Sequence, residues 1–331
     1  MTVNKKSAAV DYLKAMAAVL VVLHHAIVYP GAEKTSPVWL AVLNLISAVH
    51  VPLFFAVAGY LCHRQPLKQY LQKKASRILV PFFFFSTLKL VYSGLVSSEF
   101  AHGTSLGEQL FDAYILGNLY WFPYSIMLSY CAATLFWTEK DTPPAGKKRR
   151  LLPIFLLCLF AVNIPADLSA VKSLSVFQFG STLYFFLFFL LGMLIRQYRD
   201  PLSRFLQRHQ RKIIPLCLLI VCVLPWILVL HRGWHTHLAR LAMALPGMLV
   251  LYWVSRKLPP GLTVLNMLGK YSLQIMFMDS FWKVVLFAVL QPFIGADVLL
   301  IPLCTAANLA LSCLACRIIE KIPGIRFLVG L

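Results

Sequence analysis

Long apolar segments recur along the whole 331-residue chain, and the stretches between them carry most of the charge. A helix of about 20 apolar residues is long enough to cross the hydrocarbon core of a bilayer. Hydrophobic residues make up 60% of the chain and charged residues 13%, against roughly 45–50% and 25% in soluble domains. Water cannot solvate that excess of apolar surface. The sequence therefore predicts an all-α, polytopic integral membrane protein.

The lengths of the apolar segments predict about ten transmembrane helices. We expect the fifth to be short and the ninth to include an interfacial turn. Together they use most of the 331 residues and leave no room for a separate soluble domain, so a single membrane-embedded domain over residues 1–331 is predicted. The predicted spans lie near residues 8–29, 38–61, 78–97, 117–137, 151–166, 178–195, 213–231, 238–254, 264–290 and 298–316.

The distribution of basic residues gives the orientation. With the N-terminus inside, 23 of the 31 Lys and Arg residues fall in inner segments, and only Lys34, Lys172 and Arg232 fall in outer loops. Such an excess of positive charge marks the cytoplasmic side. We therefore expect both termini in the cytoplasm and a location in the bacterial inner membrane. The net charge of +19 does not indicate nucleic-acid binding, because the basic residues do not gather on one face.

The eight cysteines lie almost wholly within or beside apolar segments. In that setting cysteine is a small packing residue and not part of a disulfide framework. Cys313 and Cys316 form a C-x-x-C, but on an apolar helix without a βαβ context. No metal site and no bound cofactor are predicted.

The first predicted helix concentrates polar residues that lipid disfavours. Lys14 and His25 are eleven residues apart, which is about three helical turns, so they share a face that also includes Asp11. His24 is rotated away by roughly 80°. Charged residues inside a membrane usually face the interior of a helix bundle and mark function. Histidine suits general-base chemistry because its pKa lies near neutrality.

These residues resemble the opening signature of the acyltransferase 3 family of membrane O-acyltransferases, an Arg followed eleven residues later by a His. Here Lys14 replaces the Arg and His25 is the histidine. The form is similar to the fucose 4-O-acetylase-like branch. Further segments resemble the family in order: His50-Val-Pro-Leu-Phe-Phe with Gly59-Tyr60, Lys73-Lys74-Ala-Ser-Arg77, Tyr120-Trp121-Phe122, Phe188-Phe189-Leu-Leu-Gly192 and Leu268-Gly269-Lys270-Tyr271-Ser272-Leu273.

The resemblance implies transfer of an acyl group, usually acetyl, from cytoplasmic acetyl-CoA as co-substrate to a hydroxyl of a cell-surface or lipid-linked glycan. It assigns a catalytic role to His25 as general base, with Lys14 and His50 beside it. Two departures affect this assignment. Lys14 lacks the bidentate geometry of Arg, and Asp279 stands where many relatives have a His, which leaves a role at that position in doubt.

The donor phosphates require cationic groups on the inner side, and the expected binding residues are Lys73, Lys74, Arg77, Tyr120 and Trp121. The three basic residues precede a predicted helix whose first turn includes Pro81, and a helix N-terminus attracts anions. An ordinary positive-inside loop explains the same residues equally well, and the two aromatic residues also suit a membrane interface.

The carboxylate partner of His25 and the choice among three functions stay open in the sequence. Asp11 lies roughly 21 Å along the helix from His25 and more plausibly pairs with Lys14, so no carboxylate partner for His25 is identified. The alternative function is a transporter or flippase for a glycan or lipid-linked intermediate. Its pathway would be lined by Lys89, Arg240, Lys270, Lys283 and Asp279. A third possibility is an inactive relative that serves as a partner protein.

Overall fold

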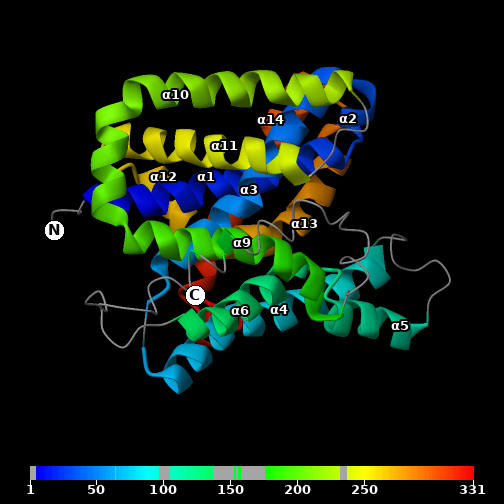
Figure 1. Cartoon of the computed structure of the whole chain (residues 1–331). Helices are drawn as coiled ribbons and strands as arrows, with labels where there is room; N and C mark the ends of the chain where they lie inside the picture. The colour runs from blue at the N-terminus through cyan, green and yellow to red at the C-terminus, as the bar shows by residue number, and fades with distance from the viewer. Residues whose placement is uncertain are drawn as a thin grey trace. The chain divides into compact units, whose positions relative to one another are not determined.

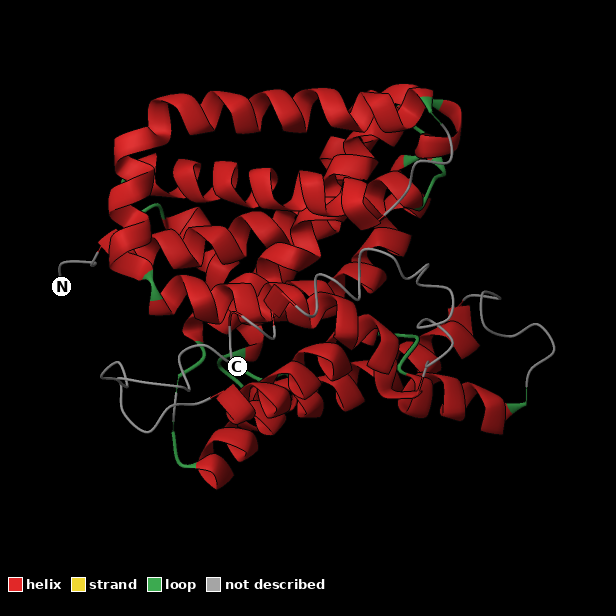
Figure 2. Ribbon diagram, in the orientation of Figure 1, coloured by secondary structure: helices red, strands yellow, loops and turns green. Residues whose placement is uncertain are grey.

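The computed structural model describes residues 5–63, 65–96, 105–136, 153, 156–157, 176–231 and 237–331. Within these ranges the chain forms helices joined by short loops, and no strand is present (Figure 2). The prediction of an all-α protein is confirmed.

The chain divides into two compact units. The first comprises Met1–Val57 and Gln197–Arg317, and the second comprises Ala58–Arg196 and Ile318–Leu331. Each unit is thus built from segments that are distant in sequence. The prediction of a single membrane-embedded domain over residues 1–331 stays a prediction.

Helix α1 (Lys5–Val28) lies at the centre of the first unit and packs against α11, α12 and α13 (Figure 1). A Cβ on Gly269 would overlap the backbone carbonyl of Asp11, so the glycine is what permits α12 to approach α1 so closely. The other helices of the unit are α2 (Ala32–Thr35), most of α3 (Pro37–Leu61), α10 (Arg199–Leu230), α11 (His237–Lys257), α12 (Thr263–Lys270), α13 (Ser272–Leu290) and most of α14 (Asp297–Ile319).

An apolar cluster fixes the C-terminal end of α1 in the first unit. Ile27 on α1, Ile46 on α3, Phe287 on α13 and Ile301 on α14 are all buried within it. Burial of each such side chain contributes about 1.5–3 kcal/mol. The cluster therefore holds four helices together next to His25, which lies two residues before Ile27 on α1.

The second unit is built around α4 (Leu67–Val96), which packs against α6 (Trp121–Ala133) and α15 (Pro323–Leu328). A Cβ on Gly59, near the end of α3, would overlap the carbonyl of Phe189 on α9, so these helices also meet backbone to backbone. The remaining elements are α5 (Leu106–Phe111), a π-helical turn (Asp112–Leu116), 3₁₀ turns (Thr134–Phe136 and Val176–Gln178) and α9 (Phe179–Gln197).

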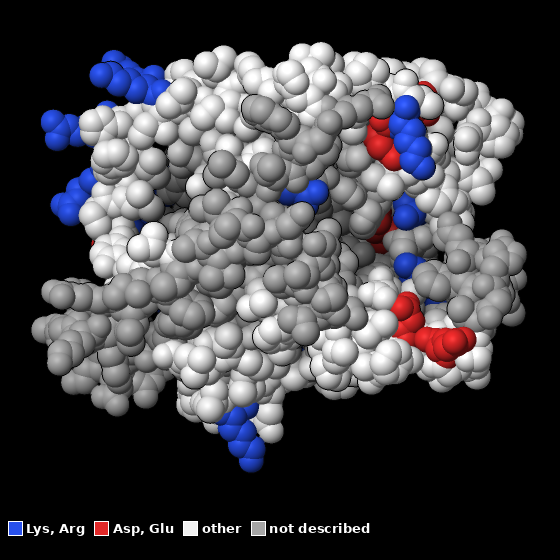
Figure 3. Space-filling model, turned by 45° about the vertical axis from the view of Figure 1, so that its right-hand side comes forward, with Lys and Arg blue, Asp and Glu red and all other residues white. Residues whose placement is uncertain are grey.

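Seven helices within the described part of the chain are long and apolar enough to cross a membrane. On the face shown in Figure 3, most of the described surface is neither acidic nor basic. Both observations agree with a multi-pass membrane protein. The seven candidate spans are Ala8–Val28, Pro37–Leu61, Leu67–Tyr92, Val176–Gln197, Arg199–Leu230, Ser272–Leu290 and Asp297–Ile319.

Three of the ten predicted spans are not among these seven. The span near 117–137 contains α6, which has only 13 residues. The span near 238–254 forms α11, which carries Arg240 and ends on Arg256 and Lys257. The span near 151–166 falls outside the described residues, except for 153, 156 and 157. The number of ten and the orientation stay predictions.

The boundaries of two predicted spans were wrong. Helix α4 begins at Leu67 instead of residue 78, and α10 begins at Arg199 instead of residue 213. The polar segments before each apolar region are rich in Lys, Arg, Gln and Leu, which are good helix formers, so they continue the helix beyond the apolar segment. The turn expected within residues 264–290 is confirmed at Tyr271, between α12 and α13, and its position at the membrane interface stays a prediction.

Candidate active site

His25 near the end of α1 is paired with Asp279 on α13. The distance from His25 Nδ1 to Asp279 Oδ2 is 2.5 Å, and the side chains are 41% and 2% exposed, respectively. The carboxylate can only accept a hydrogen bond, so Nδ1 of the neutral imidazole carries the proton and Nε2 carries a lone pair. Nε2 makes no hydrogen bond to any other described residue. The pair therefore holds the His25 ring in one orientation and leaves its side chain partly exposed.

Two buried polar side chains of α14 hold the Asp279 carboxylate in place. The Asn308 amide donates to Asp279 Oδ1 at 2.9 Å, and Ser312 Oγ donates to Asn308 Oδ1 at 3.2 Å. Asn308 and Ser312 are one helical turn apart, which lines them up on one face of α14. Each carboxylate oxygen thus has a specific partner, and Oδ2 is directed at the imidazole. The sequence analysis missed both residues of α14.

His24 and His50 lie beside the pair. Successive helical residues are rotated by about 100°, so His24 turns away from α13 and toward α3, where its Nδ1 is 3.1 Å from Ser47 Oγ. The rings of His24 and His50 are 5.0 Å apart, and those of His24 and His25 are 5.4 Å apart. His50 is buried, with its Nδ1 hydrogen-bonded to the Ile46 carbonyl at 2.6 Å. The structure thus brings the predicted residues His25 and His50 into one cluster.

Lys14 forms an ion pair with Asp11, with its Nζ 2.6 Å from Asp11 Oδ1, as the spacing on α1 predicts. Eleven residues of helix, or about 16 Å, separate Lys14 from His25. Lys14 therefore does not touch the imidazole. Its place is near the start of α1, where Gly269 brings α12 against the backbone of Asp11. A catalytic role for Lys14 stays a prediction.

The predicted donor-binding residues lie in the second unit. Lys73, Lys74 and Arg77 lie within α4 and not before it, so the expected anion-binding helix N-terminus at Pro81 is wrong. Their attraction for phosphate rests on their charge alone. Lys74 Nζ lies over the ring of Tyr130 on α6, 3.9 Å from its centroid, while Lys73 and Arg77 are exposed.

The two predicted aromatic residues, Tyr120 and Trp121, have rings that contact different side chains. Trp121, the first residue of α6, stacks on Phe185 of α9 with ring centroids 5.0 Å apart. Tyr120 is buried, and Lys89 Nζ lies 5.2 Å from the centroid of its ring. One face of the Trp121 ring is therefore already covered by protein. A contact of either ring with a substrate stays a prediction.

Asp279 is the main residue whose role the sequence did not supply. Its signal was an acid within a predicted span, a position where burial of an unpaired charge is costly. The polar pair Asn308 and Ser312 in a mostly apolar helix was a weaker signal of the same kind. Among the described residues, no group of three His, Cys, Asp or Glu side chains is placed to hold a metal ion.

Comparison with known proteins identifies the class. The acyltransferase domain that defines the acyltransferase 3 family matches residues 7–317, nearly the whole chain, so the protein belongs to this family of acyltransferases. The resemblance stated from the sequence is confirmed at the level of the family. The assignment to the fucose 4-O-acetylase-like branch stays a prediction.

Two curated relatives carry the name nodulation protein NolL. The protein of Sinorhizobium fredii (strain NBRC 101917 / NGR234) is 26% identical over 233 residues, which cover 67% of this chain and 58% of the relative. The protein of Mesorhizobium japonicum (strain LMG 29417 / CECT 9101 / MAFF 303099) is 28% identical over 134 residues, or 38% of this chain and 35% of the relative. The chain thus spans less than two thirds of either relative. No solved structure matches.

Proposed function

We propose that the protein is a multi-pass O-acetyltransferase of the bacterial inner membrane. It would transfer an acetyl group from cytoplasmic acetyl-CoA to a hydroxyl of a cell-surface or lipid-linked glycan. The observation that carries the proposal is the His25–Asp279 pair, an oriented base in a chain of the acyltransferase family. The acetyl donor, the glycan acceptor and the location follow from the resemblance and the charge distribution.

The reaction requires removal of a proton from a weakly acidic hydroxyl. In the proposed step, the acceptor oxygen attacks the thioester carbonyl while Nε2 of His25 takes the hydroxyl proton. The C–S bond then breaks, the new ester C–O bond remains, and the CoA thiolate takes up the proton from the imidazolium. General-base catalysis of this kind contributes about 10²–10⁴-fold.

Asp279 has two effects in this step. Its Oδ2 fixes the Nδ1–H tautomer, so the lone pair of His25 is on Nε2, the ring nitrogen that does not contact Asp279. Its negative charge, buried beside the ring, also stabilises the imidazolium that forms when Nε2 is protonated. His50 lies one ring beyond His24 and is the second candidate for contact with the acceptor.

The donor phosphates are assigned to the basic residues Lys73, Lys74 and Arg77 of α4. Lys74 is held against Tyr130, whereas Lys73 and Arg77 extend from the exposed side of the helix. Three cationic side chains within two turns match a ligand with several phosphate charges. No residue of the chain is assigned as an acyl carrier, and the acyl group passes directly from CoA to the acceptor in this scheme.

The two other functions considered from the sequence receive less support. The family match gives no support to a transporter. Asp279, one of the charges assigned to the transport pathway, is paired with His25, and Lys283 lies over the ring of Tyr29, 5.1 Å from its centroid. Asp279 was also a reason to suspect an inactive relative, because it departs from the family pattern. Its contact with His25 instead gives the base its partner.

The test uses glycan analysis together with the purified protein. A strain lacking the protein should lose one acetyl group from its surface glycan, and wild-type protein should restore it. His25→Gln should not restore it, although it reaches the membrane at the wild-type level. The purified wild type and His25→Gln should bind acetyl-CoA equally, because the donor residues lie in the other unit.

His63→Gln is the matched control, since His63 is an exposed histidine two residues after the end of α3. It should restore acetylation fully. Full acetylation by His25→Gln would exclude His25 as the base. The proposed function would be refuted if the deletion left the glycan unchanged and the purified protein did not bind acetyl-CoA.

A further inference from the structure

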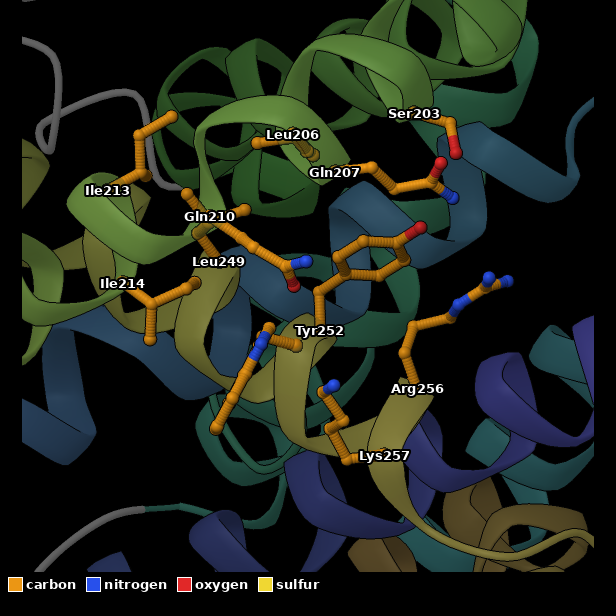
Figure 4. A pocket seen from close by; sticks show the side chains of 11 residues that line it. Ser203, Leu206, Gln207, Gln210, Ile213, Ile214, Leu249, Tyr252, Arg256 and Lys257 are labelled. Carbon is orange, nitrogen blue, oxygen red and sulfur yellow. The ribbon is translucent and has the colours of Figure 1, made fainter.

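A pocket of about 290 Å³ lies between α10 and α11, within the first unit. It has roughly ten times the volume that a water molecule occupies in the liquid, which is enough for a small headgroup. The histidine cluster contributes nothing to it. The residues that line it are Ser203, Leu206, Gln207, Gln210, Ile213 and Ile214 of α10 and Leu249, Tyr252, Trp253, Arg256 and Lys257 of α11 (Figure 4).

Both helices change from polar to apolar along the length of this pocket. The lining of α10 begins with Ser203 and Gln207 and ends with Ile213 and Ile214. Figure 4 shows Ile213, Ile214 and Leu249 toward one end and Ser203, Gln207 and Arg256 toward the other. The lining of α11 runs the other way along the chain, from Leu249 to Arg256 and Lys257, so both helices contribute to an apolar end and to a polar end.

The position of α10 in a bilayer explains this order. Its 32 residues extend about 48 Å, well beyond the roughly 30 Å of hydrocarbon. Residues 199–212 hold five basic residues and one acid, whereas residues 213–230 hold no charged residue. The boundary between them falls at Ile213, inside the pocket. A bilayer whose hydrocarbon covers residues 213–230 would bring its headgroups and the first part of its acyl chains to this pocket.

The polar end favours an anion. Arg256 and Lys257 both line it, and no Asp or Glu is among the lining residues. Lys257 Nζ is 5.8 Å from the centroid of the Trp253 ring, and Tyr252 is also in the lining. Aromatic side chains of this type are typical of the membrane–water interface, and basic pockets between helices bind lipid phosphates.

We propose that this pocket binds an anionic phospholipid of the bilayer. The phosphate would contact Arg256 and Lys257, the glycerol would reach Gln207 and Gln210, and the first part of an acyl chain would pack on Ile213, Ile214 and Leu249. A neutral phospholipid matches the apolar end equally well but gains less at the cationic end. The proposal does not depend on the catalytic role of His25.

The experiment measures lipid binding to the full-length protein in a neutral detergent, by native mass spectrometry and by titration with a fluorescent phosphatidylglycerol. Phosphatidylglycerol should bind at least tenfold more tightly than phosphatidylcholine. Arg256→Gln/Lys257→Gln should lose that preference, with a loss of about fivefold for each charge removed. If the double variant is unstable, Lys257→Gln alone should show the fivefold loss, because Lys257 is exposed.

The matched control is Arg204→Gln/Arg208→Gln, which removes two exposed charges of α10 that do not line the pocket. It should change phosphatidylglycerol binding by less than twofold. Equal losses in the two double variants would mean general electrostatic attraction and would overturn the proposal. Displacement of the lipid by excess soluble glycerol phosphate would also overturn it, because the pocket would then be a phosphate site without a lipid requirement.

Discussion

Replacing Asp279 with Asn tests the proposed base most directly, because the structure determines how the new amide must lie. Asn308 donates its amide N–H to Oδ1 of Asp279 and requires an acceptor there. The amide oxygen of an Asn at position 279 would occupy that place. Its NH₂ group would then face His25 Nδ1 in the place of Oδ2, which now accepts the imidazole proton.

The substitution would therefore invert the tautomer of His25. Nδ1 would accept a hydrogen bond from the amide, the proton would move to Nε2, and the lone pair needed at Nε2 would be lost. The wrong tautomer in a comparable histidine–carboxylate pair lowers the rate about 10⁴-fold. We expect a reduction of about 10³–10⁴-fold in kcat, while the fold and the size of the side chain are retained.

The assay measures acetyl transfer by purified protein to a membrane glycan fraction, together with acetyl-CoA binding and thermal unfolding. Asp279→Asn should bind acetyl-CoA as the wild type does and should lower kcat rather than raise KM. The double variant with His25→Gln should have nearly the same kcat as His25→Gln alone, since both substitutions disable the same proposed base. Asp200→Asn, which removes an exposed acid of α10, should leave kcat unchanged.

A folded Asp279→Asn protein with kcat within tenfold of the wild type would refute the reasoning. So would additive effects of the two substitutions. Either result would show that the carboxylate does not act through the His25 tautomer, and the 2.5 Å contact would then be structural only.

Three further substitutions test other parts of the structure. Asn308→Ala removes the partner of Asp279 Oδ1 and should lower kcat about tenfold, measured with acetyl-CoA binding as the unchanged reference. Lys74→Met should raise KM for acetyl-CoA severalfold in initial-rate measurements, while the same change at the exposed Lys68 should not. Gly269→Ala should lower the free energy of unfolding in detergent by about 1–3 kcal/mol, because the new Cβ overlaps the backbone of α1. The control Gly295→Ala should leave it unchanged, because no atom lies within 4 Å of a Cβ at that position.

Most of the helical architecture could be predicted from the sequence because lipid imposes a simple rule on apolar length. Helices α1, α3, α9, α11 and α14 lie within a few residues of their predicted spans, and α12 and α13 together fill the span predicted near 264–290. Apolar length does not determine where a helix ends once it leaves the lipid, so the polar N-terminal extensions of α4 and α10 were not predicted. It also did not anticipate α6, which has only 13 residues within a predicted span of 21.

The candidate site also has a part that the sequence predicts and a part that it does not. The face of α1 that joins Lys14 and His25, and the ion pair of Lys14 with Asp11, follow from helical geometry within one segment. The partner of His25 lies 254 residues away, so it depends on how α13 packs against α1. No local pattern contains that information. The sequence marked Asp279 as an acid in an apolar span but could not say which residue it meets.

The burial of Asp279 is itself an argument for function. A carboxylate that is 2% exposed in an apolar helix bundle is costly unless its partners compensate for the lost hydration. Here it has His25 on one oxygen and Asn308 on the other, and Ser312 in turn supports Asn308. Replacing a buried ionic group with apolar residues is often neutral or stabilising, so packing alone does not explain four polar side chains from three helices at one point. Orientation of the proposed base does explain them, because a charged, doubly anchored carboxylate fixes both the tautomer and the direction of the imidazole.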